Sequence, residues 1–196
     1  MINYLRNWLL LAATLLVLAP SAFAQSEKDK ARLAEIRTAY TDAMNLAKKN
    51  QAPETKNTMV FQSVQTDPNG VWKRKLEFIV KQDYIEELDI YYPVVKLIRQ
   101  TNDGCLQEFL YDDEGNLMFV FERVIPDGED TASEYRYYYD KGVPFWEIEK
   151  SVAAGTWKVL ETRQGPVDES DGSAIFLARV AHDLHTAFEA LTVMYD

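Results

Sequence analysis

Glycine turns at regular intervals constrain the fold of this chain more than any other feature of its sequence. Six times, two turn-forming residues precede a glycine between strand-like segments: Pro68-Asn69-Gly70, Asn102-Asp103-Gly104, Asp113-Glu114-Gly115, Pro126-Asp127-Gly128, Asp140-Lys141-Gly142 and Ala153-Ala154-Gly155. A three-residue hairpin loop ends on a residue with positive φ, which glycine adopts without steric cost. The last five glycines lie 11, 13, 14 and 13 residues apart, the length of one strand and one loop. The pattern therefore predicts an antiparallel meander.

The same spacing divides the chain into strands. We expect them near residues 57–67, 71–81, 89–101, 105–112, 116–125, 132–139, 143–152 and 156–162, with 82–88 as a longer connection or a bulge. The segments "YDDEGNLMFVFE" (111–122) and "YYDKGVPFWEIE" (138–149) share tyrosine, aspartate, glycine and glutamate positions. This repetition follows from turn geometry and requires no duplicated function.

Helical patterns stand on both sides of the strands. Ser26 and Asp29 have the spacing of a capping box, and an apolar stripe follows them at Leu33, Ile36, Tyr40, Ala43, Met44 and Ala47. Asp168, Glu169, Ser170 and Asp171 supply acids and caps for a helix start, and a second apolar stripe follows at Leu177, Val180, Leu184, Phe188 and Leu191. Helix, meander and helix together predict an α+β domain with one helix at each end of the chain.

Several predicted strands are apolar on both faces of the sheet. Leu117, Phe119 and Phe121 alternate with Met118 and Val120. We expect the two helices to cover one face, and the other face to curl on itself, to pair with another chain or a second copy, or to hold a ligand. A strongly curved or partly closed sheet is therefore predicted.

The first 24 residues have the pattern of a cleaved secretory signal peptide. Arg6 precedes the apolar run 8–18, and "AFA" supplies small residues before Gln25. The run is too short to span a bilayer, and no later segment of the chain is long and apolar enough to do so. We therefore expect a single domain over residues 25–196 in a secreted or periplasmic protein. Cys105 is the one cysteine, so an internal disulfide is excluded.

The segments "LAEIRTAYTDAMNLAKKN" (33–50), "LQEFLYDDEGNLMFVFER" (106–123) and "EYRYYYDKG" (134–142) carry a resemblance to known proteins. Following a signal peptide, they are similar to a group of exported proteins of unknown function from Bacteroides-type bacteria. The resemblance implies export and implies nothing about catalytic or binding residues.

Charge and motifs exclude several classes of function. The formal net charge of −10 repels nucleic acid and anionic lipid headgroups. No phosphate loop, dinucleotide fingerprint or nucleophile elbow occurs, and no cofactor is expected. His182, His185 and Glu189 share one helix stripe and are weak candidates for a metal site; we interpret them as solvated surface residues.

Aromatic residues are the remaining functional signal. Tyr135, Tyr137 and Tyr139 alternate on one strand, so they share a face, and we expect Phe119 or Phe121 of the neighbouring strand on that face with them. The predicted ligand-binding set is Tyr135, Tyr137, Tyr139, Phe119, Phe121 and Trp146. The sequence thus favours a non-enzymatic exported domain that binds a small apolar or aromatic ligand or a protein partner. An extracytoplasmic hydrolase with carboxylate catalysis and a structural component of an envelope assembly are the alternatives.

Overall fold

One antiparallel sheet with a helix on each side forms the fold. The computed structural model describes residues 25–49, 58–67, 70–126, 128–168 and 171–193. All eight strands pair in sequence order, and the sheet stays open with β1 and β8 as its edges. The strands are β1 (Thr58–Asp67), β2 (Gly70–Ile85), β3 (Ile90–Asn102), β4 (Cys105–Tyr111), β5 (Leu117–Val124), β6 (Thr131–Asp140), β7 (Val143–Ala153) and β8 (Val159–Gly165). The predicted α+β meander is confirmed.

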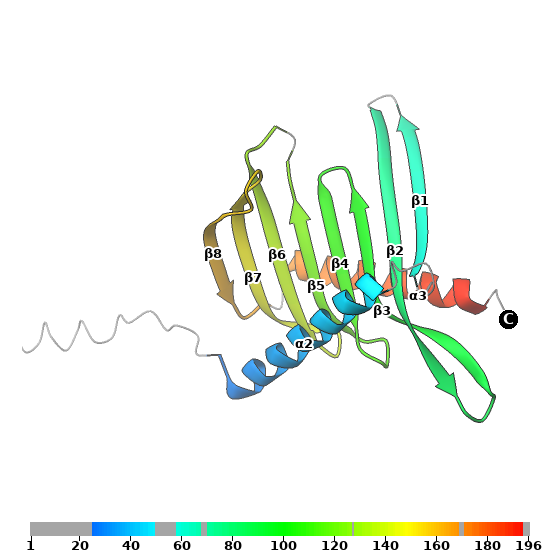
Figure 1. Cartoon of the computed structure of the whole chain (residues 1–196). Helices are drawn as coiled ribbons and strands as arrows, with labels where there is room; N and C mark the ends of the chain where they lie inside the picture. Colours follow the sequence, from blue (N-terminus) through cyan, green and yellow to red (C-terminus); the bar gives the residue numbers. More distant parts are fainter. Residues whose placement is uncertain (1–24, 50–57, 68–69, 127, 169–170, 194–196) are drawn as a thin grey trace, which may run out of the picture.

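The β2–β3 hairpin is longer than predicted. β2 runs on to Ile85, and the chain turns only at residues 86–89, where Asp89 has a φ of 55°. A register shift between Ile79 and Val80 lies within β2. The segment 82–88 is therefore mostly strand and turn, and the hairpin tip extends well past the rest of the sheet (Figure 1).

The turns confirm most of the predicted glycine conformations but are tighter than expected. Asp140 pairs with Val143, so the β6–β7 loop contains two residues, Lys141 and Gly142, with φ of 51° and 79°. Two positive φ values in a two-residue loop are the geometry of a type I′ turn, whose twist matches that of the strands. In the β7–β8 loop the prediction is wrong, because Trp157 and not Gly155 has positive φ (58°).

Both helices begin at the caps that the sequence predicts. Helix α2 (Glu27–Lys49) follows Ser26, whose Oγ accepts the Asp29 amide at 3.1 Å and donates to the Asp29 carboxylate at 2.6 Å. Helix α3 (Gly172–Val193) follows Asp171, whose carboxylate accepts the amides of residues 173 and 174 at 2.8 and 3.2 Å. These contacts satisfy helix amides that have no partner inside the helix.

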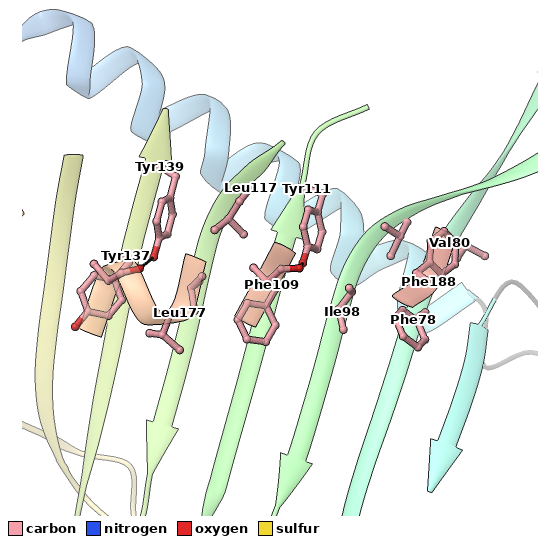
Figure 2. Close-up of a cluster of buried hydrophobic side chains, with 14 residues drawn as sticks. Phe78, Val80, Ile98, Phe109, Tyr111, Leu117, Tyr137, Tyr139, Leu177 and Phe188 are labelled. Carbon is pink, nitrogen blue, oxygen red and sulfur yellow. Dashed lines mark hydrogen bonds between the residues drawn. The ribbon is translucent and has the colours of Figure 1, made fainter. Parts of the chain in front are cut away.

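The two helices lie on opposite faces of the sheet, α2 in front and α3 behind in Figure 1. The α2-side cluster is Leu33, Ile36, Ala43, Ala47, Ile79, Leu97, Leu110, Met118, Phe119, Phe121, Tyr138 and Trp146. The α3-side cluster includes Phe78, Val80, Val95, Ile98, Phe109, Tyr111, Leu117, Val120, Tyr137, Tyr139, Ala174, Leu177, Ala181 and Phe188, ten of which Figure 2 labels. The expectation that both helices cover one face is therefore wrong. Each face has its own helix, which explains why central strands such as β5 are apolar on both sides.

The register of β5 and β6 decides which aromatic residues share a face. Phe119 pairs with Tyr138, and Val120 pairs with Tyr137. Side chains of directly paired residues lie on the same face of a sheet. Tyr135, Tyr137 and Tyr139 do share a face, as predicted, but Phe119 and Phe121 both lie on the other one, so the expectation that either would join the tyrosines is wrong.

Residues 1–24, the predicted signal peptide, lie outside the described residues. Within the part of the chain that the structure describes, no helix is both long enough and apolar enough to cross a bilayer.

Candidate functional site

Two tyrosines on the α3 side of the sheet, Tyr111 and the predicted binding residue Tyr139, are structural anchors for α3. The Tyr139 hydroxyl donates to the Ala174 carbonyl at 2.9 Å, and the Tyr111 hydroxyl donates to the Ala181 carbonyl at 2.7 Å. Both rings are buried in the α3-side cluster (Figure 2), and burial raises the pKa of both hydroxyls. Their hydroxyls thus find partners inside the protein, as buried tyrosines require.

The remaining predicted aromatic residues divide between the two faces. Tyr137 is buried and stacks on the half-buried Tyr135, with ring centroids 6.4 Å apart and planes 6° apart. Trp146 is buried on the α2 side, opposite Tyr138. The structure therefore does not bring the six predicted residues to one site.

Phe119 and Phe121 line a cavity of about 560 Å³ on the α2 side of the sheet. Tyr40 and Met44 of α2 form one border of the cavity. Strands β3 to β6 supply the rest of the lining: Arg99, Thr101, Leu106, Glu108, Phe119, Phe121, Arg123 and Arg136. The cavity thus lies where the second half of α2 meets the middle of the sheet.

Strand register arranges the α2 side of the sheet in rows that change from apolar to charged. Under α2, direct cross-strand partners form the row Leu97, Leu110, Phe119 and Tyr138, of which Phe119 lines the cavity. Two residues further along each strand, on the same face, the row is Arg99, Glu108, Phe121 and Arg136. The cavity therefore has an apolar side near the helix and a cationic side beyond it.

Glu108 organises the β3 side of the cavity. It is 4% exposed, and its carboxylate accepts hydrogen bonds from the Tyr40 hydroxyl and from Arg99 Nε at 2.7 Å. Burial, followed by the charge of Glu108, raises the pKa of Tyr40, so the hydroxyl stays protonated and remains a donor. Arg99 also donates to Met44 Sδ at 3.3 Å. These bonds connect α2 to the floor of the cavity.

Glu134 has the same role between β5 and β6. It is 5% exposed; its Oε1 accepts Arg123 Nε at 3.0 Å, and its Oε2 accepts Arg136 Nη2 at 2.9 Å. A buried ion pair contributes little net stability compared with apolar residues, but it fixes the direction of the groups that it joins. The carboxylate is thus enclosed behind two guanidinium groups whose side chains are 28% and 24% exposed.

Phe121 holds these two guanidinium groups in place. The Arg123 and Arg136 guanidinium carbons lie 5.3 and 5.4 Å from the centroid of its ring, and Arg123 also lies 4.2 Å from the ring of Trp157. Cation–π contacts at this range add to the pairing with Glu134. The arrangement limits the rotamers of both arginines, so it presents a preorganised cationic surface to the cavity.

The predicted metal candidates occupy a different place, between α3 and two turns of the meander. His182 is exposed, whereas His185 is half-buried, with its ring 5.0 Å from that of Tyr111 and its Nδ1 3.6 Å from the Glu189 carboxylate. The interpretation of His185 as a solvated residue is therefore wrong. Among the described residues, no group of three or more histidine, cysteine, aspartate or glutamate side chains could hold a metal ion.

Two other groups bear on catalysis. Burial, with the charges of Asp171 and Glu149, raises the pKa of Glu147, but Glu147 pairs with Tyr137 and so lies on the α3 side, away from the arginines. Burial and then the charge of Glu122 raise the pKa of the Cys105 thiol to about 11. This cysteine is therefore poorly suited to act as a nucleophile at neutral pH.

Sequence reasoning missed the arginines and their buried glutamates. One signal was present: Leu106, Glu108 and Leu110 alternate on one strand, which places a carboxylate between two inward-facing leucines. Charged residues at core-facing strand positions require partners. The partners come from neighbouring strands, so only the register identifies them.

The chain was compared with protein-family models, with curated proteins and with solved structures, and none of the three comparisons found a match.

Proposed function

We propose that this chain is an exported, non-enzymatic binding domain whose ligand site is the cavity between α2 and strands β3–β6. One observation carries the proposal: three arginines and two phenylalanines converge on this cavity, and buried carboxylates hold the arginines in place. Ligand sites are typically apolar concavities with a few fixed polar groups. The sequence pattern of residues 1–24 supports the export part of the proposal.

Binding is favoured over hydrolysis by the state of the carboxylates around the cavity. Glu108 and Glu134 are enclosed and accept hydrogen bonds from arginine or tyrosine. A general acid needs a pKa near the working pH, and a general base needs access to its substrate. Carboxylates that are paired and buried in this way serve to orient the arginines.

The test is a fluorescence titration with N-phenyl-1-naphthylamine, a neutral aromatic probe that brightens in apolar sites. We expect saturable binding by the purified protein and its loss in Leu106→Trp, because the larger ring fills the cavity that Leu106 lines. Val143→Trp is the matched control, since Val143 is 65% exposed at the start of β7.

Equal binding by the protein and by a folded Leu106→Trp variant would place the probe elsewhere and overturn the proposal. The absence of any saturable binding would do the same. Circular dichroism and a thermal melt of each variant establish that it is folded.

A further inference from the structure

We infer that the ligand of this cavity is an organic monoanion, with a flat apolar body on Phe119 and Phe121 and a carboxylate bound by Arg123 and Arg136. The inference rests on the proposed function, because it names the ligand class of the same site.

The charge balance of the network favours one negative charge. Arg99 connects the cavity to a neighbouring pair on β2, since its Nη1 lies 3.8 Å from Glu77, which also pairs with Lys75 at 2.7 Å. Two separate groups of ion pairs border the cavity: Lys75 and Arg99 balance Glu77 and Glu108, whereas Arg123 and Arg136 face the single carboxylate of Glu134. One positive charge is left over, in a chain whose formal net charge is −10. A monoanion neutralises this charge, whereas a dianion such as a phosphate monoester overcompensates it.

The arginines retain donors for such an anion. Arg123 uses Nε and Nη2 on Glu134, and Arg136 uses Nη2. Among the described residues no protein acceptor lies on Nη1 of either arginine, and both side chains line the cavity. Two guanidinium groups at one wall match the two oxygens of a planar carboxylate.

The rings are placed for the rest of the ligand. Phe121 lies directly beside Arg136 in the cross-strand register, and Phe119 is two residues before Phe121 on the same face, close to α2. Tyr40 meets Phe119 edge to face at 5.3 Å, which fixes the ring that borders the helix. Phe119 and Phe121 are only 5% and 7% exposed, so a flat apolar group extending from the arginines toward α2 would contact the small part of each ring that borders the cavity.

The test compares three compounds with one aromatic body by isothermal titration calorimetry: 2-naphthoate, the neutral 2-naphthamide and 2-naphthyl phosphate. We expect 2-naphthoate to bind about tenfold or more tightly than 2-naphthamide, as charge-assisted bonds to arginine imply, and to weaken with added salt. The phosphate should bind no more tightly than the carboxylate.

Variants then assign the arginines. In Arg136→Gln, 2-naphthoate should lose most of its advantage over 2-naphthamide, because the charge-assisted bonds are lost, while Glu134 keeps Arg123 as a partner. Arg163→Gln makes the same charge change at a side chain that is 72% exposed on β8, so it should leave both affinities as they are. If Arg136→Gln does not fold, Arg136→Lys keeps a cation beside Glu134 and should still weaken 2-naphthoate selectively, because lysine lacks the planar pair of donors.

The outcomes separate the two proposals. Equal affinities for 2-naphthoate and 2-naphthamide, or tighter binding of the phosphate, overturn the monoanion class and leave the cavity as a binding site. The monoanion class is also overturned if the protein holds the neutral naphthylamine probe in the cavity but binds neither 2-naphthoate nor 2-naphthamide. Failure of the naphthylamine probe itself overturns the proposed function.

Discussion

Replacing Tyr111 with phenylalanine tests how the sheet holds α3. The variant keeps a ring that is 2% exposed in the α3-side cluster and removes only the hydroxyl that donates to the Ala181 carbonyl at 2.7 Å. Tyr139→Phe is the parallel change on β6, where the hydroxyl donates to the Ala174 carbonyl at 2.9 Å. The two carbonyls lie two helical turns apart, so the two bonds fix α3 at two points.

The expected cost of each variant is about 1 kcal/mol of unfolding free energy. The cost is smaller than that of leaving a buried carbonyl without a hydrogen bond. Each of the two carbonyls lies within the helix and still accepts the amide four residues later. For a domain of this size, about 1 kcal/mol lowers the melting temperature by roughly 2–4 °C. The double variant should cost the sum, about 2 kcal/mol, since the two bonds share no atoms.

Urea unfolding followed by circular dichroism measures these values. The midpoint should fall while the slope stays constant, because the buried surface is unchanged. Tyr91→Phe is the matched control, because Tyr91 is 71% exposed. If Tyr111→Phe and Tyr139→Phe cost no more than Tyr91→Phe, the hydroxyls do not anchor α3 and the reasoning fails.

Three further predictions concern a turn, a thiol and a helix cap. Gly115→Ala should destabilise the protein more than Gly142→Ala in thermal melts. Both glycines have φ near 80°, but a Cβ at 115 would lie 2.9 Å from His185 Nε2, whereas none of the described atoms lies within 4 Å of a Cβ at 142. Equal losses of stability would contradict the packing of His185. At pH 8 Cys105 should react with iodoacetamide about 100-fold more slowly than in the urea-unfolded chain, because its pKa is raised to about 11, and equal rates would contradict its burial. Ser26→Ala should cost about 1 kcal/mol and speed amide exchange in the first turn of α2, since the Asp29 amide loses its acceptor; unchanged exchange would contradict the cap.

The sequence predicts the strands and caps because their signals are local. A turn such as Asp140-Lys141-Gly142 needs a particular backbone conformation, and glycine at the last position shows where it falls. The caps at Ser26 and Asp171 likewise combine a side chain with amides no more than three residues away. Such features can be read without knowing the fold.

The placement of the helices cannot be read in the same way. The apolar stripes of α2 and α3 show that each helix packs on something, but neither stripe identifies a face of the sheet. The two-sided apolar pattern of β5 contains the missing information, since two apolar faces need two covers. The two covers are the two helices, one on each face, and not a second chain, a ligand or closure of the sheet.

The candidate site depends on register, which the sequence defines least. Phe119 and Phe121 are predicted binding residues that do line the cavity, and they could be named because runs of aromatic residues are visible in a strand sequence. Their partners Arg99 and Arg136 come from two other strands. A shift of one residue in any pairing would turn those arginines to the opposite face, so the site exists only once the pairing is known.

The most direct test of the binding account is a crystal structure of the protein soaked in 2-naphthoate. The account predicts electron density for the compound in the cavity between α2 and β3–β6, with its carboxylate within hydrogen-bonding distance of Arg123 and Arg136 and its rings against Phe121. Density at another surface, or an empty cavity at a concentration that saturates binding in solution, would contradict it.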